Sequence, residues 1–143
     1  TSSAFVVNPD RTKVLMVYHN IYNSWSWTGG HADGDPNLLR VAKKELMEEA
    51  GLNEVKAVQK QMISLDILPV IGHVKNGKYV APHLHFNATY VFEVQEDAAI
   101  TAKLDENSAV GWINIDEIAQ KCSEPHMIPV YEKILAKIKE QQL

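Results

Sequence analysis

The sequence has few of the features on which secreted and membrane proteins depend. It contains a single cysteine, Cys122, so no disulfide can form within the chain. A lone thiol is typical of a reducing compartment, where we expect Cys122 to be a small buried side chain. No apolar run approaches the roughly 18 residues of a transmembrane helix, and no secretory signal peptide is evident at the start. We therefore expect a cytoplasmic protein without a membrane segment.

An excess of basic charge is also missing. Lys and Arg number 14 against 18 Asp and Glu, which gives a net charge of −4. Nucleic-acid-binding domains usually carry a basic patch, so we expect no nucleic-acid partner. The chain has 143 residues, of which 45% are hydrophobic, and this suits a domain of about 100 to 150 residues with one sizeable core. Without repeats or linkers, residues 1–143 are expected to form a single domain.

The most informative stretch runs from Trp27 to Leu52, where a glycine pair, a helix and three glutamates follow one another. Asp35 is a favourable N-cap and Pro36 fits the first helical position, so the sequence predicts a helix that begins at Pro36. Gly51 can adopt the left-handed conformation that ends a helix. The apolar residues of this helix recur at steps of three and four and predict one buried stripe: Leu39, Ala42, Leu46 and Ala50.

Three carboxylates lie beside that stripe. At about 100° per residue, Glu45, Glu48 and Glu49 fall within an arc of roughly 100°. Like charges at these spacings each cost about 0.2 to 0.5 kcal/mol on an isolated helix, which favours a divalent cation among them. The commoner interpretation of such a run is a solvated acidic face. The glycine pair Gly29-Gly30 favours the cation, because it lets the backbone approach a metal-bound polyphosphate.

From Gly30 to Leu52 the sequence resembles the signature of the Nudix hydrolases, Gly-x5-Glu-x7-Arg-Glu-U-x-Glu-Glu-x-Gly-U, where U is a bulky aliphatic residue. The matching positions are Gly30, Glu45, Leu46, Glu48, Glu49, Gly51 and Leu52. The first glutamate of the signature falls on Pro36 and its arginine falls on Lys44. Asp35 is close enough to supply a carboxylate, and Lys44 keeps the positive charge without the planar fork of arginine. We expect these departures to affect the support of the site rather than its identity.

The resemblance implies a fold and an activity. The fold is α/β: a Nudix-like α/β/α sandwich with a mixed β-sheet between the box helix and a C-terminal helix. The activity is Mg²⁺-dependent hydrolysis of a diphosphate bond in a nucleoside diphosphate linked to another moiety, with Mn²⁺ as an alternative ion. The partner is then a small-molecule nucleotide or another diphosphate, and the protein is either a monomer or a homodimer.

The resemblance also implies residue roles. The three glutamates of the box, Glu45, Glu48 and Glu49, form the catalytic and metal-binding group, in which Glu45 orients or deprotonates the attacking water. The carbonyl of Gly29 and a fourth carboxylate complete the metal site; Glu106 is the candidate, with Asp105 second. Lys44 and Asp35 are supporting residues. The expected substrate-binding residues are Gly30, Tyr22, His83, His85 and Phe86.

The rest of the chain predicts strands and one further helix. Ala4–Val7 and Lys13–Tyr18 flank a turn at Asn8–Arg11 and predict a hairpin, and Asn76-Gly77 predicts a second. The strand from His83 alternates, so one face is expected to be core: Leu84, Phe86, Ala88, Tyr90, Phe92 and Val94. Its other face is expected to be solvated, although His83 and His85 there could bind phosphate or a base. A final amphipathic helix follows Ser123, with Tyr131, Ile134, Leu135 and Ile138 inward. For Trp25 and Trp27 a place in the core is expected rather than the alternative, a platform for the substrate.

Two other functions remain open at this point. One is a noncatalytic Nudix-like nucleotide-binding or sensory module, although the three box glutamates are intact. The other is an enzyme similar to isopentenyl diphosphate isomerase, which is expected to need an active-site cysteine. Cys122 lies late in the chain and is poorly placed for that role.

Overall fold

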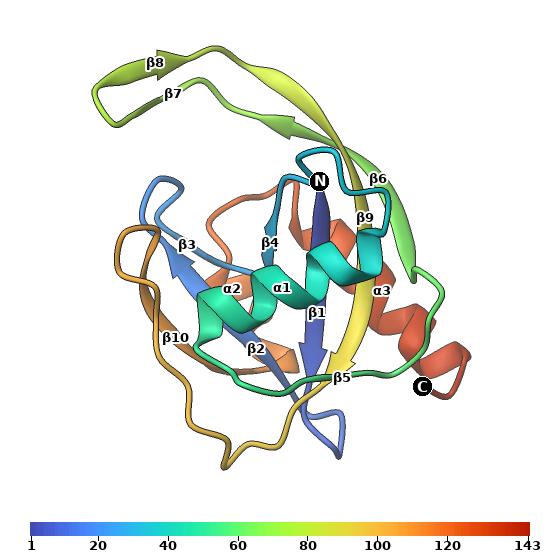
Figure 1. The fold of residues 1–143 in the computed structure, drawn as a ribbon. Coiled ribbons are helices and arrows are strands. Elements are labelled where there is room, and N and C mark those ends of the chain that lie inside the picture. Colours follow the sequence, from blue (N-terminus) through green and yellow to red (C-terminus); the bar gives the residue numbers. More distant parts are fainter.

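The computed structural model describes residues 1–143, which form a mixed β-sheet with helices on both faces (Figure 1). The strands of the main sheet are β1 (Ser2–Val7), β2 (Lys13–His19), β3 (Ser24–Ser26), β4 (Thr28–Gly30), β5 (Lys56–Ala57), β6 (Ser64–Val70), β9 (His83–Glu93) and β10 (Asn107–Asn114). A separate hairpin is formed by β7 (His73–Lys75) and β8 (Lys78–Val80). The helices are α1 (Leu38–Ala50), α2 (Ile118–Lys121) and α3 (Ile128–Glu140), and a 3-10 turn, η1 (Ile115–Glu117), precedes α2. No helix has the length and apolar character needed to cross a membrane.

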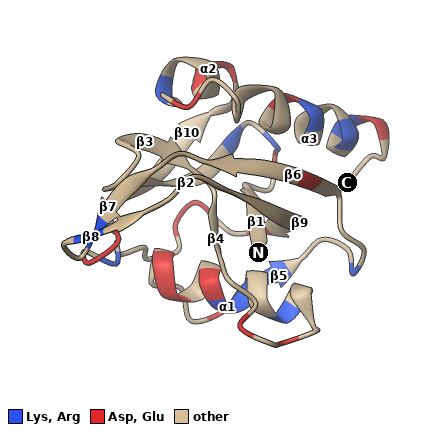
Figure 2. Cartoon of the chain, turned by 90° about the horizontal axis from the view of Figure 1, so that it is seen from above, with Lys and Arg blue, Asp and Glu red and all other residues tan.

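Three layers make up the molecule. The sheet follows the order β10-β2-β1-β9-β5, with β1 and β9 parallel and the other pairs antiparallel. Figure 2 shows α1 on one side of this sheet and α2 and α3 on the other. Because alternate side chains of a strand point to opposite faces, β1 supplies Phe5 and Val7 to the core under α3 and Ala4 and Val6 to the core under α1. The predicted α/β/α sandwich is confirmed.

The turn between β1 and β2 is closed by Asn8, as its sequence predicts. The buried Oδ1 atom of Asn8 accepts hydrogen bonds from the backbone N–H groups of Thr12 (2.9 Å) and Lys13 (3.0 Å). Arg11 in this turn has a positive φ of 62°. The second predicted hairpin is also present, with Asn76 and Gly77 at positive φ between β7 and β8.

Helix α1 starts later than its sequence predicts. Asn37 is the N-cap, and its Oδ1 atom accepts from the N–H of Arg40 at 3.0 Å. Asp35 instead accepts two hydrogen bonds from the Arg40 guanidinium, at 2.7 and 2.9 Å, and one from the N–H of Asn37. A fork-to-fork pair with arginine occupies the Asp35 carboxylate, so the predicted start at Pro36 with Asp35 as cap is wrong. The end is as predicted: Gly51 has a φ of 66° and donates to the carbonyl of Met47.

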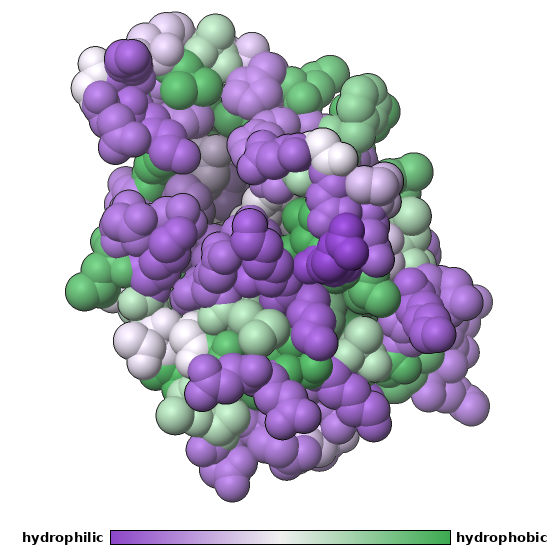
Figure 3. All heavy atoms as spheres, viewed as in Figure 1, coloured by the Kyte–Doolittle hydropathy of each residue, from purple (hydrophilic) through white to green (hydrophobic).

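Strand β9 corrects the expected division into a core face and a solvated face. Leu84 and Phe86, expected in the core, are 62% and 70% exposed. At this end β9 pairs with β6 and extends beyond α1, so no helix covers these two side chains; apolar surface gathers over β6 and β9 in Figure 3. Further along, Asn87, Thr89 and Val91 are buried although a solvated face was expected. A sheet covered on both sides buries both faces of its central strands.

The C-terminal helix follows its predicted pattern. Tyr131, Ile134 and Ile138 of α3 are buried against the sheet, and Leu135 packs beside them while partly exposed. Cys122 is also buried in this core, as predicted.

Candidate functional site

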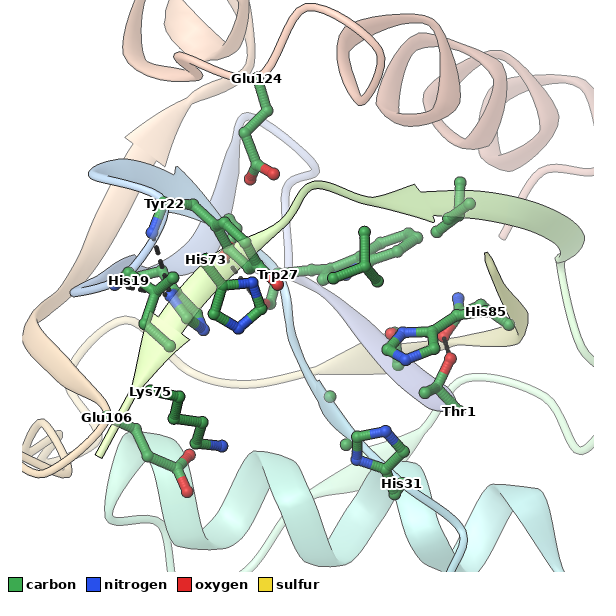
Figure 4. A pocket seen from close by; sticks show the side chains of 18 of the residues that line it. Thr1, His19, Tyr22, Trp27, His31, His73, Lys75, His85, Glu106 and Glu124 are labelled. Carbon is green, nitrogen blue, oxygen red and sulfur yellow. Dashed lines mark hydrogen bonds between the residues drawn. The ribbon is translucent and has the colours of Figure 1, made fainter. Parts of the chain in front are cut away.

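A cleft of about 720 Å³ opens between α1, the β7–β8 hairpin and the loop before α3 (Figure 4). Ligand sites of this kind commonly measure about 300 to 1,000 Å³. All six histidines of the chain line it: His19, His31, His73, His83, His85 and His126. The lining also includes carboxylates at both ends of the cleft.

The end near α1 is shaped by the glycine pair of β4. The N–H of Gly29 donates to Oε2 of Glu49 at 2.9 Å. A side chain at Gly30 would place a Cβ 2.5 Å from Cδ of Glu45, a distance that real atoms do not adopt. Because β4 pairs with β1, the sheet fixes where these two glutamates lie. The backbone at Gly29 and Gly30 therefore positions the box carboxylates.

Glu49 is the most deeply buried acidic side chain, at 4% exposure. Its pKa is raised to about 8. Burial is the largest cause, and the charges of Glu106 and Glu45 act in the same direction, whereas the hydrogen bond from the Gly29 N–H lowers the pKa. The pKa of Glu45 is raised by burial and then by the neighbouring charges of Glu48 and Glu106. Groups whose charge is unfavourable in this way are typical of functional sites.

Glu106 joins this acidic group from a distant part of the sequence. It lies in the loop just before β10, where its carbonyl accepts from the N–H of Asn20 at 3.1 Å. Its carboxylate is 3.3 Å from Nζ of Lys103. Glu106 and Asp105 both line the cleft, so the structure brings Glu45, Glu49 and the predicted fourth carboxylate to the same end.

Glu48 is placed differently from its two neighbours. It does not line the cleft; its side chain is 44% exposed and lies 3.9 Å from Nζ of Lys44. The supporting residue Lys44 thus contacts Glu48 rather than the buried Glu49. Asp35 is bound to Arg40 and does not line the cleft either.

The donor set at the α1 end suits a hard cation. No three His, Cys, Asp or Glu side chains are arranged around one point as a finished metal site. Mg²⁺, however, commonly takes only one or two carboxylates and completes its shell with waters and substrate phosphates. Glu49 is a buried carboxylate whose charge is opposed by Glu45 and Glu106. A divalent cation at this place would compensate that charge, so the residues fit the ion.

The wall beside this end carries imidazoles. His83 and His85 project from β9 with their Nε2 atoms 3.0 Å apart, and His31, which follows Gly30, packs edge-on to His85 with ring centroids 5.0 Å apart. Tyr22 lines the cleft further along, stacked on His19 at 4.5 Å. Phe86 does not line the cleft, because it lies on the opposite face of β9 from His85. Its expected contact with substrate is therefore corrected.

The other end of the cleft was missed by the sequence analysis. Trp27 lines it instead of lying wholly in the core, and Glu124, His126 and Met127 reach it from the loop before α3. Trp25, by contrast, packs edge-on to Tyr18. No local spacing links Trp27 to residues about 100 positions later in the chain. Only the packing of α3 on the sheet brings them together.

Comparisons with known proteins agree with this architecture. A sequence model of the NUDIX domain matches residues 1–134, whereas no curated protein matches the sequence. A NUDIX-family hydrolase structure from Clostridium perfringens aligns with a TM-score of 0.68 at 16% identity and 94% coverage of each chain. A C. elegans Ap4A hydrolase aligns at 0.69 with 12% identity, covering 97% of this chain and 98% of the other.

A third structure adds a ligand-bound relative. The NUDIX domain of Shewanella oneidensis NrtR, complexed with ADP ribose, aligns with a TM-score of 0.61 at 14% identity, covering 99% of this chain and 86% of that one. At these identities the structural likeness establishes the fold, while the sequence model establishes the family. The chain therefore belongs to the NUDIX domain family.

Proposed function

We propose that this Nudix pyrophosphohydrolase uses Mg²⁺ to cleave the diphosphate bond of a nucleoside diphosphate linked to another moiety. The observation that carries the proposal is the Glu49 carboxylate. It is 4% exposed, accepts a hydrogen bond from Gly29, and faces the charges of Glu106 and Glu45 without a basic partner of its own. Burying an uncompensated carboxylate is costly, and a metal-bound diphosphate removes that cost.

The metal site would be built from Glu49, Glu106 and the carbonyl of Gly29, with Glu48 joining from the edge of the cleft. When bound, Mg²⁺ polarises phosphoryl oxygens and neutralises charge that develops in the transition state. Mn²⁺ has the same ligand preferences and is the alternative ion.

Glu45 would hold the attacking water and accept its proton. Its carboxylate lies against the bare Cα of Gly30, and burial together with two neighbouring acidic charges raises its pKa. A general base works best when its pKa approaches the working pH. His83 and His85 would donate N–H groups to phosphate oxygens on the side of the cleft that lacks carboxylates.

The test is a chromatographic assay on a panel of nucleoside diphosphate derivatives with Mg²⁺, with Mn²⁺ and with EDTA, in which the nucleoside monophosphate and the phosphorylated moiety are measured as products. Glu49→Gln keeps the shape of the side chain and removes its charge. We expect EDTA to abolish turnover, and the substitution to lower kcat by at least about a hundredfold, the loss typical of removing a positioned catalytic group. Glu132→Gln, on the exposed face of α3, is the matched control. Turnover that survives both EDTA and Glu49→Gln would refute the proposal.

The other two functions have less support. An isomerase would need a thiol in the cleft, whereas Cys122 is buried in the core and does not line it. A noncatalytic binding module would have no need for three mutually repelling carboxylates. Tight nucleotide binding without release of any product in the same assay would favour that module. A cytoplasmic location is proposed on the lone buried thiol.

A further inference from the structure

The end of the cleft farthest from α1 contains a carboxylate that the proposed hydrolysis does not use. Glu124 reaches down from the loop before α3 towards Tyr22, His73 and Trp27 (Figure 4). Its side chain is only 15% exposed, and its carboxylate accepts no hydrogen bond within the protein. The nearest basic group is Nε2 of His126, 3.8 Å away. Glu124 is thus a half-buried carboxylate that no donor in the protein hydrogen-bonds, and a ligand N–H group could satisfy it.

Aromatic side chains lie beside this acceptor and pack against neighbouring rings. The Trp27 ring packs edge-on to Tyr131 with ring centroids 5.4 Å apart, and the backbone N–H of Trp27 donates to the Tyr131 hydroxyl at 3.3 Å. Tyr22 stacks on His19 and meets His73 edge-on at 5.8 Å. After burial, the charge of Glu124 also raises the pKa of both Tyr22 and Tyr131. Flat apolar walls with one polar acceptor are typical of a pocket for a planar heterocycle.

The hydrogen-bonding edge of each nucleobase decides which one fits. An ionised carboxylate only accepts hydrogen bonds and offers two oxygens side by side. Guanine presents two adjacent donors, its ring N1–H and its exocyclic amine. Adenine and cytosine present a donor beside a ring-nitrogen acceptor, and uracil presents one donor between two carbonyl oxygens, so each of these would bring a lone pair against the carboxylate.

We propose that Glu124, with Trp27 and Tyr22, forms a base-binding subsite that selects guanine nucleotides. The base lies at the Glu124 end, and the diphosphate extends towards Glu45 and Glu49 at the α1 end. A cleft of about 720 Å³ accommodates a nucleotide in this orientation. This inference rests on the proposed function only for the direction of the diphosphate, because base recognition requires neither the metal nor turnover.

Binding of nucleoside monophosphates in EDTA tests the subsite separately from hydrolysis. Isothermal titration calorimetry would compare GMP, AMP, CMP and UMP, with phosphocholine as a cationic ligand that aromatic pockets also bind. A bidentate pair is worth enough to favour one base by about tenfold or more. We therefore expect GMP to bind at least about tenfold more tightly than every other ligand.

The variant Glu124→Gln replaces one acceptor oxygen by an amide donor without changing the shape of the side chain. It should reduce the preference for GMP over AMP to less than about threefold. Glu132→Gln makes the same chemical change on the exposed face of α3 and should leave the preference unchanged. Thermal unfolding would check that both variants are folded.

Four results would overturn the subsite: no GMP binding at millimolar concentration, equal binding of the four nucleotides, tighter binding of phosphocholine, or a guanine preference that persists in Glu124→Gln. Hydrolysis could still proceed with Mg²⁺ in each of these cases. Conversely, selective GMP binding by a protein that hydrolyses nothing would refute the proposed function and leave the subsite standing.

Discussion

Replacing Glu49 by glutamine should make the metal-free protein more stable and should change how its stability depends on pH. Glu49 has a pKa of about 8 in the folded chain against 4.5 for an ordinary glutamate. Between these two pH values the folded state holds a proton that the unfolded state has released. Binding of this proton contributes to the free energy of unfolding. The contribution is fully present below pH 4.5 and is lost as the pH rises towards 8.

The size of the effect follows from that window. Each pH unit between the two pKa values costs the folded state about 1.4 kcal/mol. At pH 7 the loss amounts to about 3 kcal/mol, which corresponds to about 10 °C in Tm for a chain of this length. Glutamine does not titrate, and its side-chain oxygen can still accept the hydrogen bond from Gly29. The variant therefore avoids the loss.

Urea unfolding of both proteins in EDTA, from pH 4 to pH 8, measures the effect as a difference. Titrating groups that do not interact with Glu49 contribute equally to both chains, so the difference in unfolding free energy reports Glu49 together with its coupling to Glu45 and Glu106. We expect it to grow by about 3 kcal/mol in favour of Glu49→Gln between pH 4 and pH 7. Adding Mg²⁺ at pH 8 should stabilise the unsubstituted protein and have a smaller effect on the variant. Parallel stability curves for the two proteins would show that burial does not raise the pKa of Glu49.

Two glycines give further predictions. Gly30→Ala would place its Cβ 2.5 Å from Cδ of Glu45; since the flexible carboxylate can move, the unfolding free energy should change by less than about 1 kcal/mol, while kcat falls by at least about tenfold. A loss of stability without a loss of kcat would contradict the role given to Glu45. Gly51→Ala must adopt a φ of 66° and approach the backbone of Thr101 at 3.0 Å, so it should destabilise the protein by about 1 to 2 kcal/mol. Urea unfolding at pH 7 checks this value, and an unchanged midpoint would refute it.

Much of the fold could be predicted because its signals are local. The Asn8 turn, the Asn76-Gly77 hairpin and the Gly51 helix end each depend on a few neighbouring residues whose conformational preferences agree. The start of α1 was mispredicted because two acceptable caps, Asp35 and Asn37, lie close together. The choice between them depends on the pairing of Arg40 with Asp35, which the cap pattern does not contain.

The errors on β9 have a different cause. Alternation specifies which side chains share a face of a strand, but it does not specify what covers that face. Leu84 and Phe86 follow the same alternation as the buried residues further along β9. They lie, however, at the end of β9 that extends beyond α1. Their exposure depends on how far α1 extends over the sheet and on the pairing of β9 with β6. Both depend on the tertiary structure.

In the candidate site, too, some residues could be found from local sequence signals and others depend on long-range packing. Glu45 and Glu49 come from one helix and could be found by spacing, whereas Glu124 and Trp27 meet only when α3 docks on the sheet. If both proposals hold, the end predicted from the local signature performs the chemistry and the end assembled by packing selects the base. Enzymes of one fold commonly differ in this way, because function depends on the groups that the fold carries.

The two departures from the box signature lie away from the buried carboxylate. Pro36 is exposed before the first turn of α1, and Lys44 is exposed and lies near Glu48. Neither contacts Glu49, which is held by the N–H of Gly29. Since β4 is fixed to β1 by the sheet, the backbone rather than an arginine positions the buried carboxylate. A substitution at Lys44 should therefore affect Glu48 first, and the chain retains a positioned acidic group despite lacking two residues of the signature.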